Sequence, residues 1–542
     1  MPLQGSVYRC LICTSITSNT VDDAIADMYE ARRTGADLVE FRADYLSEGE
    51  PWERVVEQRP LPMIFTYRPV CEGGLSDMND HERVRLLQRA VERGVEYVDV
   101  ELANMDLFRF PESVRQQDAS TRPKLIVSYH SFTRALNEAE LAELYTAIVA
   151  TGADVCKIAM MCHDLCDNAR LFDLLKRTAG SKPTIAIGMG EHGQMSRILV
   201  AKFGPAMLTF TALSEARASA PGQLRTDELV QHYRFHSLNP DTTVYGVIGA
   251  PVSHSMSPRI HNHAFGLLRL NHVYLPFLVQ DGSKLGHFLD TMTRYGLRGA
   301  SVTIPHKQRV MECLDELDDI AKQIGAVNTI VVDPLTGRRK GYNTDWQAAI
   351  DAVTDALERD GKLETVRSEA LRRRHVVLLG AGGAARAIAF GAVHRHCGKL
   401  TVINRTLERA QSLVNDLVAF GETELVARSL EDFCRIQLNP ETREHIDILM
   451  NSTSIGMYPE TDTIPIPKEI LEPHLLVFDA IYNPIETKLL KLARQTGCRT
   501  IDGVEMFVRQ AAAQFTLWTG LTAPIQEMRA TVMQELGQMA QH

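Results

Sequence analysis

The first 212 residues alternate short apolar runs with amphipathic segments. Segments such as residues 20–35 and 80–94 begin with polar residues, carry apolar residues three and four positions apart, and end in glycine. This spacing predicts helices, and the β-branched or apolar runs between them predict buried strands. The eight expected strands are Val7–Cys13, Asp37–Phe41, Pro62–Tyr67, Glu96–Glu101, Lys124–Tyr129, Asp154–Ala159, Thr184–Gly188 and Ala206–Thr211.

Eight strand-helix units at about 30 residues each are typical of a (β/α)₈ barrel, with an open doubly wound sheet as the alternative. In such a barrel the catalytic side chains come from the C-terminal ends of the strands. Polar residues do occupy those positions. They are Glu40, Arg42, Arg68, Glu72, His130 and Lys157. This agreement between several strand ends favours the barrel.

The helical and strand periodicity lapses near residue 240, in a polar connection that contains proline, and a second α/β series opens at Val244. A third unit begins at residues 372–392, where a strand, a glycine-rich turn and an alanine-rich helix follow one another. We therefore expect an α/β protein in which a barrel is followed by two further α/β units, the second of the Rossmann type. The expected boundaries are 1–238, 239–348, 349–500 and 501–542.

The composition is that of a globular enzyme for small molecules. With 45% hydrophobic and 23% charged residues the chain can build large cores, and its net charge of −10 gives no reason to expect nucleic acid or a membrane as partner. The N-terminal residues lack an apolar signal core, which predicts a cytosolic protein. Ten cysteines without dense spacing indicate reduced thiols. Cys10 and Cys13 lack a second pair, so we expect no metal.

Lys157 lies inside the apolar run Asp154–Ala159. Removing an ammonium from water costs several kcal/mol unless it is paired or loses its proton, so the segment is either wrongly assigned as a buried strand, or its lysine extends to the surface, or the lysine is there for its chemistry. A neutral amine attacks a ketone to give an iminium, whose charge makes a neighbouring C–H acidic. A base then removes that proton and a β-hydroxyl departs. His130 is the expected base, because histidine titrates near neutral pH.

Six motifs of the first region resemble type I 3-dehydroquinate dehydratases over residues 5–235. They are "EFRAD" at 40–44, "TYRPVCEGG" at 66–74, "SYHSF" at 128–132, "KIA" at 157–159, "MGEHGQMSR" at 189–197 and "ASAPGQ" at 218–223. The resemblance implies that Lys157 forms the Schiff base, that His130 is the general acid/base, and that Glu72 orients His130. It assigns substrate binding to Arg197, Arg68, Glu40 and Arg42, and a closing loop to Ser219 and Gln223.

The segment "GAGGAARA" at 380–387 follows the expected strand His375–Leu379 and fits a dinucleotide-binding turn, in which glycines let the backbone approach a pyrophosphate. The next strand ends in Asn404 and Arg405, where NAD enzymes tend to carry an acidic residue, so the chain favours the 2′-phosphate of NADP. The expected cofactor residues are Gly380, Ala381, Gly382, Gly383, Ala384, Asn404, Arg405, Thr406 and Arg409.

The second and third regions resemble shikimate dehydrogenases over about residues 243–535. The motifs are "GAPVSHSMSP" at 249–258, "SVTIPHK" at 301–307, "GAVNT" at 325–329, "GYNTDW" at 341–346, "NSTSIGM" at 451–457, "DAIYNP" at 479–484 and the segment Gly503–Gly520. The resemblance implies a catalytic pair of Lys307 and Asp345, which can polarise a ketone and relay a proton. It implies substrate contacts from Ser255, Ser257, Thr303, Asn328, Asn343, Tyr482 and Gln510. It also implies that residues 239–348 form the substrate domain and that the helices in 501–542 return to it.

Two positions depart from the pattern of the bacterial shikimate dehydrogenases. Ser301 stands where most of them have asparagine, and Trp346 stands where glycine is common. The first departure is familiar from plant fusion enzymes with the same domain order, and the second leaves the local geometry open.

The sequence thus predicts a fused enzyme that dehydrates 3-dehydroquinate to 3-dehydroshikimate and reduces this product to shikimate with NADPH. The expected partners are these small molecules. One alternative is a catabolic quinate/shikimate dehydrogenase that uses NAD, which Arg405 argues against. Another is a non-catalytic metabolite sensor, which the intact residues Lys157, His130, Lys307 and Asp345 argue against.

Overall fold

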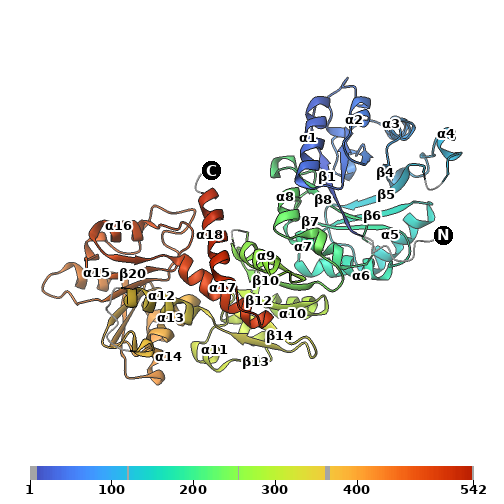
Figure 1. The fold of residues 1–542 in the computed structure, drawn as a ribbon. Helices are drawn as coiled ribbons and strands as arrows, with labels where there is room; N and C mark the ends of the chain where they lie inside the picture. Colours follow the sequence, from blue (N-terminus) through green and yellow to red (C-terminus); the bar gives the residue numbers. More distant parts are fainter. Residues whose placement is uncertain (1–8, 119–120, 205, 254, 360–365, 540–542) are drawn as a thin grey trace. The chain divides into compact units, whose positions relative to one another are not determined.

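The computed structural model describes residues 9–118, 121–204, 206–253, 255–359 and 366–539. The chain divides into two compact units (Figure 1). The first comprises residues 1–244 with the segments 269–278 and 290–296, and the second comprises residues 245–268, 279–289 and 297–542. Among the described residues, no helix is long and apolar enough to cross a membrane.

The first unit contains the predicted barrel. Its strands are β1 (Leu11–Ile16), β2 (Leu38–Arg42), β3 (Met63–Thr66), β4 (Tyr97–Glu101), β5 (Lys124–Ser131), β6 (Val155–Met161), β7 (Thr184–Met189) and β8 (Leu208–Ala212), with the short β9 (Leu224–Arg225) beside β8. Parallel pairing runs in sequence order from β1 to β7, and β1 also pairs with β8. β7 meets the chain before β8 through a bridge between Thr184 and Ala206, which closes the ring.

The barrel helices begin and end where capping residues satisfy free backbone groups. They are α1 (Val21–Thr34), α2 (Glu53–Glu57), α3 (Asp80–Glu92), α4 (Glu112–Arg115), α5 (Glu138–Ala150), α6 (Asn168–Arg177), α7 (Gln194–Leu199) and α8 (Thr226–Gln231). The side chain of Thr20 accepts a hydrogen bond from the backbone of Asp23 at the start of α1, and Gly35 ends this helix with a φ of 105°. Asn137 and Glu140 form a capping box on α5.

The first strand was predicted too early, at Val7–Cys13, and residues 7 and 8 of that range lie outside the described part of the chain. The structure continues β1 to Ile16. Thr14 and Ser15 lie in this extension of the strand and are buried, although their side chains are polar. Thr14 shares hydrogen bonds with Thr211 and Thr226, which satisfies its hydroxyl inside the barrel.

A second sheet has the strand order β11-β10-β12-β14-β15-β13 and mixed direction, since β14 runs antiparallel to both β12 and β15. Its strands are β10 (Thr243–Gly249), β11 (His272–Leu278), β12 (Leu297–Val302), β13 (Glu316–Leu317), β14 (Thr329–Val332) and β15 (Arg339–Tyr342). The helices of this region are α9 (Ser257–Leu267), α10 (Leu285–Arg294) and α11 (Asp319–Ile324).

The third sheet is parallel, with the strand order β18-β17-β16-β19-β20-β21. The order reverses at β16, which is the strand pattern of a Rossmann fold, so ligands are expected at the C-terminal ends of β16 and β19. The strands are β16 (His375–Leu379), β17 (Lys399–Asn404), β18 (Glu424–Ser429), β19 (Ile448–Asn451), β20 (Leu476–Asp479) and β21 (Arg499–Ile501). The predicted fold class is confirmed.

Helices cover this parallel sheet and connect its strands. They are α12 (Asp345–Arg359), α13 (Gly383–His394), α14 (Leu407–Leu417), α15 (Leu430–Leu438) and α16 (Lys488–Thr496). After the last strand follow α17 (Gly503–Thr519), which packs on α12, and α18 (Ile525–Met539), which packs on α9 and α17. One hydrophobic core joins α12 and α13 to one face of the sheet, and a second core joins α15 and α16 to the other side chains of its strands. The sheet is therefore buried on both faces, as parallel sheets are.

Candidate active sites

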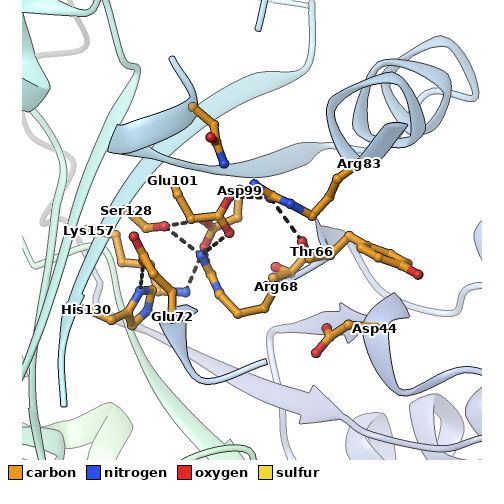
Figure 2. A network of polar contacts seen from close by, with 12 residues as sticks. Asp44, Thr66, Arg68, Glu72, Arg83, Asp99, Glu101, Ser128, His130 and Lys157 are labelled. Carbon is orange, nitrogen blue, oxygen red and sulfur yellow. Dashed lines mark hydrogen bonds and ion pairs between the residues drawn. The ribbon is translucent and has the colours of Figure 1, made fainter. Parts of the chain in front are cut away.

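All nine side chains predicted for the barrel site line one pocket at the C-terminal ends of its strands. They are Glu40, Arg42, Arg68, Glu72, His130, Lys157, Arg197, Ser219 and Gln223. Phe132, Ile187, Met189 and Phe210 supply an apolar wall. Figure 2 shows the polar network that surrounds Arg68, Lys157 and His130. The pocket thus combines an apolar wall with charged groups of both signs.

The ammonium of Lys157 is buried and doubly paired. Its Nζ donates hydrogen bonds to Asp99 Oδ2 at 2.8 Å and to Glu40 Oε1 at 3.2 Å, and the side chain is 5% exposed. The same nitrogen lies 4.4 Å from the centre of the Phe210 ring. The apolar surroundings suggested by the sequence of β6 are thus only part of its environment, because two carboxylates from other strands balance the charge.

Asp99 is a site residue that the sequence reasoning missed. Its carboxylate also accepts hydrogen bonds from Arg68 Nη2 at 2.8 Å and from Ser128 Oγ at 2.6 Å (Figure 2). Glu101, two residues further along β4, accepts from Arg68 Nη1 at 2.7 Å. Like Lys157, Asp99 and Glu101 are charged residues inside an otherwise apolar strand. The same sequence feature could therefore have identified both as candidate site residues.

The two carboxylates beside Lys157 remain ionised. Burial raises the pKa of Asp99, but the charges of Arg68 and Lys157 outweigh burial and hold it well below its usual range. Burial likewise opposes ionisation of Glu40, and Lys157 and the neighbouring arginines lower its pKa below the ordinary value. Neither group can therefore take up a proton near neutral pH.

His130 and Glu72 form a pair, with His130 Nδ1 2.8 Å from Glu72 Oε2. Burial lowers the pKa of His130 well below 6.5, and the charges of Arg68 and Lys157 lower it further, so the imidazole is neutral at neutral pH. Burial raises the pKa of Glu72 to about 7. An ionised Glu72 accepts the proton of Nδ1, which leaves the lone pair on Nε2 for use as a base.

Arg197 is the one pocket arginine that lacks a carboxylate partner among the described residues. It is 1% exposed, its Nε has no partner there, and its contacts are to the carbonyls of Phe210 and Pro221 at 3.4 Å. Burial lowers its pKa to about 10. By contrast, Arg42 makes two hydrogen bonds to Asp44, at 2.9 and 2.7 Å. A buried guanidinium of this kind suits an anionic ligand.

Ser219 and Gln223 hold each other on the loop after β8. The backbone N–H of Ser219 donates to Gln223 Oε1 at 2.8 Å, and Ser219 Oγ donates to Ser15 Oγ at 3.1 Å. Ser15 in turn donates to Glu40 at 3.0 Å. The loop is thereby connected to the carboxylate that contacts Lys157.

In the second unit, Lys307 and Asp345 form the predicted pair. Lys307 Nζ donates to Asp345 Oδ2 at 2.6 Å, and Asn328 Nδ2 donates to the other oxygen at 2.8 Å. Asn343 Oδ1 accepts from the backbone N–H of Asp345 at 3.0 Å. Asp345 is the first residue of α12, and Asn328, which binds its carboxylate, directly precedes β14. The pair is therefore rigidly oriented.

The remaining predicted substrate residues lie on four segments. Tyr482 stacks on Phe507 of α17, with ring centres 4.4 Å apart, and Gln510 lies one turn further along that helix. A backbone hydrogen bond from Met256 reaches the Tyr482 hydroxyl, whose pKa burial raises. Met256 lies between Ser255 and Ser257. The backbone N–H of Ser257 donates a hydrogen bond to Ser255 Oγ at 3.3 Å. His254 of the same motif lies outside the described residues.

Thr303 comes directly after β12. Its backbone N–H donates to the carbonyl of Ile248 at 2.9 Å, and its methyl group packs against Gly249. Gly249 opens the motif that carries Ser255 and Ser257, so these segments lie side by side.

The two departures from the bacterial pattern have structural explanations. Ser301 Oγ donates to Gln514 Oε1 at 2.8 Å, and Gln514 Nε2 donates to the carbonyl of Asn328 at 3.3 Å, which connects α17 to the Asn328 segment. Trp346 is 8% exposed and packs on Phe390 and His394 of α13. Its ring therefore fills the hydrophobic core and leaves the geometry of Asp345 undisturbed.

The glycine-rich turn after β16 suits a dinucleotide. Gly380 has a φ of 110°, and a methyl group placed on Gly382 would meet no atom within 4 Å, so the backbone there is open to a ligand. A methyl group placed on Gly383 would lie 3.1 Å from the aliphatic side-chain carbons of Lys307, so Gly383 packs against this lysine. Ala381 and Ala384 complete this turn, and α13 begins at Gly383.

The end of β17 supplies the expected positive charge. Arg405 and Arg409 are exposed, and their guanidinium groups have no ion pair or hydrogen bond among the described residues. Asn404 Nδ2 donates to the carbonyl of Thr406 at 2.8 Å, which shapes the turn between them. Two unpaired guanidinium groups at the end of the second Rossmann strand fit the 2′-phosphate of NADP.

Models of known protein families match both halves of the chain. The model of type I 3-dehydroquinase matches residues 12–240. The models of the shikimate dehydrogenase substrate binding domain, of shikimate/quinate 5-dehydrogenase and of the shikimate 5′-dehydrogenase C-terminal domain match residues 247–330, 362–456 and 503–533. The chain is 41% identical to a bifunctional 3-dehydroquinate dehydratase/shikimate dehydrogenase of Arabidopsis thaliana, over 95% of this chain and 83% of the relative. The chain belongs to this bifunctional family.

Two further similarities concern the second unit and the whole chain. A shikimate dehydrogenase (NADP(+)) of Moorella thermoacetica is 40% identical over 55% of this chain and 94% of its own length. The solved dehydroquinate dehydratase and shikimate dehydrogenase of the S. pombe AroM protein is 25% identical, with a TM-score of 0.42, over 97% of this chain and 99% of that structure. The predicted family, its two activities and NADP as cofactor are confirmed.

The prediction of a cytosolic location is wrong, because the Arabidopsis relative is named as a chloroplastic enzyme. The prediction relied on the lack of an apolar signal core, which is a feature of secretory export alone. Segments that direct proteins to organelles are amphipathic and leave no such mark.

Proposed function

We propose that the first unit dehydrates 3-dehydroquinate through a Schiff base on Lys157 and that the second unit reduces the resulting 3-dehydroshikimate to shikimate with NADPH. The observation that carries the proposal is the buried Lys157, which lies in one pocket with a neutral histidine and an arginine that lacks an anionic partner. The proposed partners are these small molecules, and neither nucleic acid nor a membrane is among them.

We also propose the domain boundaries 1–238, 239–348, 349–500 and 501–542. The spans of the family models support the first three. Hydrogen bonds from Gln514 to Asn328 and from Trp518 Nε1 to the carbonyl of Ile330 support the return of the C-terminal helices to the substrate domain.

In the proposed dehydration, Arg197 binds the substrate carboxylate and thereby gains the anion that its buried guanidinium lacks. The ammonium of Lys157 first passes a proton to Nε2 of the neutral His130, and the resulting amine adds to the ketone. The proton then returns to the hydroxyl of the adduct, which leaves as water and gives an iminium. Asp99 and Glu40 stay ionised beside this nitrogen, so they stabilise the positive charge of the iminium as they stabilise the ammonium. Arg42 and Arg68, with Ser219 and Gln223, complete the substrate pocket.

His130 then acts as the base. Its Nε2 removes the proton next to the iminium carbon, and the imidazolium that forms is stabilised by Glu72 on Nδ1. The electron pair released by the C–H bond expels the β-hydroxyl, and the imidazolium supplies the proton that lets it leave as water. A second water hydrolyses the iminium and restores Lys157, so the net reaction is the loss of one water.

In the proposed reduction, bound NADPH supplies the hydride. Lys307 donates a hydrogen bond to the ketone oxygen and then a proton to the forming alkoxide, while Asp345 and Asn328 keep its Nζ in place. Ser255, Ser257, Thr303, Asn343, Tyr482 and Gln510 bind the substrate. The turn Gly380–Ala384 holds the pyrophosphate, and Asn404, Arg405, Thr406 and Arg409 hold the adenosine 2′-phosphate.

The purified chain, supplied with 3-dehydroquinate and NADPH, should produce 3-dehydroshikimate and then consume NADPH. Borohydride added during turnover should leave a covalent adduct on Lys157, which peptide mapping by mass spectrometry identifies. An adduct on another lysine, or full dehydratase activity in Lys157→Ala, would contradict the Schiff-base assignment. Lys307→Ala should abolish NADPH consumption and leave dehydration intact, which tests the second site separately.

A further inference from the structure

Asp479, the last residue of β20, is a buried carboxylate that the two proposed reactions do not use. It is fully buried and accepts three hydrogen bonds, from Asn451 Nδ2 at 3.0 Å, from the backbone N–H of Ile481 at 3.1 Å and from Thr487 Oγ1 at 2.7 Å. Ile481 and Thr487 lie on the loop after β20, and Asn451 lies at the end of β19. A buried carboxylate without a cation is costly, so its retention calls for a functional reason.

Each donor segment leads toward a different part of the dehydrogenase site. Asn451 ends β19 and also accepts from the backbone N–H of Thr453 at 3.1 Å, so it shapes the loop 452–458. In this loop, Ser452 Oγ donates to the carbonyl of Leu379 at 2.7 Å, directly before Gly380 of the dinucleotide turn. Ile481 precedes Tyr482, which stacks on Phe507. The carboxylate thus connects a loop beside the cofactor turn to a loop that carries a substrate residue.

The two loops also contact each other directly. The backbone N–H of Tyr458 donates to the carbonyl of Asn483 at 3.1 Å. Thr487, which donates to Asp479, also caps α16 by accepting from the backbone N–H of Leu490 at 3.3 Å. The position of both loops therefore depends on one acceptor.

We propose that the ionised carboxylate of Asp479 is a positioning group that holds the cofactor loop 452–458 and the substrate loop 480–487 in register for hydride transfer. This inference rests on the proposed function of the second unit. An ionised carboxylate offers only acceptors, which matches its three donors. A protonated carboxyl must donate its hydrogen instead, and of the three partners only the Thr487 hydroxyl can accept it, so the bond to Thr487 reverses and is no longer assisted by charge.

Among the described residues, no charged group contacts the carboxylate of Asp479. On the neighbouring elements, Glu486 pairs with Arg494 at 2.5 Å and Lys488 donates to the carbonyl of Asp462 at 2.6 Å. Lys491 of α16, Arg499 of β21 and Tyr482 are titratable groups on neighbouring segments, and none of them is among the causes that shift the pKa of Asp479. Burial raises the pKa of Asp479 to about 6, against the three hydrogen bonds that lower it.

We expect the pH profile of the dehydrogenase reaction to have an acid limb, a fall in activity at low pH that is caused by protonation of Asp479. With NADPH and 3-dehydroshikimate, kcat/KM should fall as the pH drops through about 6. Thr487→Val removes one hydrogen bond to the ionised form and should move this limb upward by about one pH unit. Asp479→Asn should lower kcat/KM at least tenfold at pH 8, raise KM for both NADPH and 3-dehydroshikimate, and abolish the limb.

Asp447→Asn is the matched control, because Asp447 accepts a hydrogen bond from the backbone of His375 at the N-terminal ends of β16 and β19, whereas Asp479 lies at the C-terminal end of β20. It should leave the limb in place. Dehydratase activity, measured on the same samples, should stay within twofold in every variant. If Asp479→Asn fails to fold, the shift in Thr487→Val still decides the question.

A flat profile between pH 5 and 7 in the parent, an unmoved limb in Thr487→Val, or the same shift in Asp447→Asn would overturn the inference. These outcomes differ from failure of the proposed function, in which no variant and no pH gives NADPH consumption.

Discussion

The lysines that we propose as catalytic in the two units differ in how their charge is balanced. The side chain of Lys157 is 5% exposed and contacts two carboxylates, whereas that of Lys307 is 16% exposed and contacts one, whose second oxygen is held by Asn328. In the proposed reactions, the nitrogen of Lys157 is positively charged both as an ammonium and as an iminium, so permanent countercharges would stabilise both states. Lys307 would deliver a proton, for which one orienting carboxylate is enough. The difference in burial and pairing thus matches the two proposed roles.

The largest expected effect separates the two sites. His130→Ala should lower dehydratase kcat by about 10²- to 10⁴-fold, because it removes the general base. Dehydrogenase activity of the same preparation should stay within threefold, since its residues belong to the second unit. Separate assays with 3-dehydroquinate and with 3-dehydroshikimate measure the two. A comparable loss in both reactions would show that the two sites do not act independently.

The countercharge of Lys157 is tested by Asp99→Asn, which keeps the size of the side chain and removes its charge. We expect a loss of about 100-fold in dehydratase kcat and in the rate of borohydride trapping, because a charged hydrogen bond to a buried cation contributes about 1.5–3 kcal/mol. Glu101→Gln is the control, since Glu101 contacts Arg68 and Arg83. If both variants lose the same fraction of the trapping rate, Asp99 acts only through its contact with Arg68, and not as a countercharge of Lys157.

The cofactor end of the second unit is tested by Arg405→Ala. The variant should lower kcat/KM for NADPH at least tenfold and leave NADH almost unchanged, because the 2′-phosphate is the group that distinguishes the two cofactors. The parent enzyme should prefer NADPH by a similar factor. Steady-state kinetics with both cofactors provides the measurement, and a parallel loss for both would refute the assignment of Arg405.

The smallest expected effect concerns pH. Burial raises the pKa of Glu72 to about 7, and the carboxylate must be ionised to hold His130 in its basic tautomer. Dehydratase kcat/KM should therefore rise with pH up to about 7 and fall by about tenfold per unit below it. Glu72→Gln should remove this limb. Persistence of the limb in that variant would assign it to another group.

The sequence predicted most of the barrel site because parallel strands converge on one edge, so polar residues at strand ends must come together. Asp99 was missed for a related reason. An acidic residue inside a strand has the same local appearance whether it pairs with a catalytic lysine or with a structural arginine, and Asp99 does both. Strand β1 was placed too early because Thr14 and Ser15 are polar, and their hydrogen-bond partners lie on other strands.

The chain by itself determined the order of its helices and strands, the residues at the strand ends and the preference for NADP. These follow from periodicity and from short motifs, in which the relevant groups are close in sequence. The tertiary structure decided that Lys157 pairs with Asp99 and Glu40, that Trp346 fills a core, and that Asp479 connects two loops. The partners of Lys157 are 58 and 117 residues away in the chain. Only packing brings such groups within hydrogen-bonding distance, and only then do burial and neighbouring charges set their protonation states.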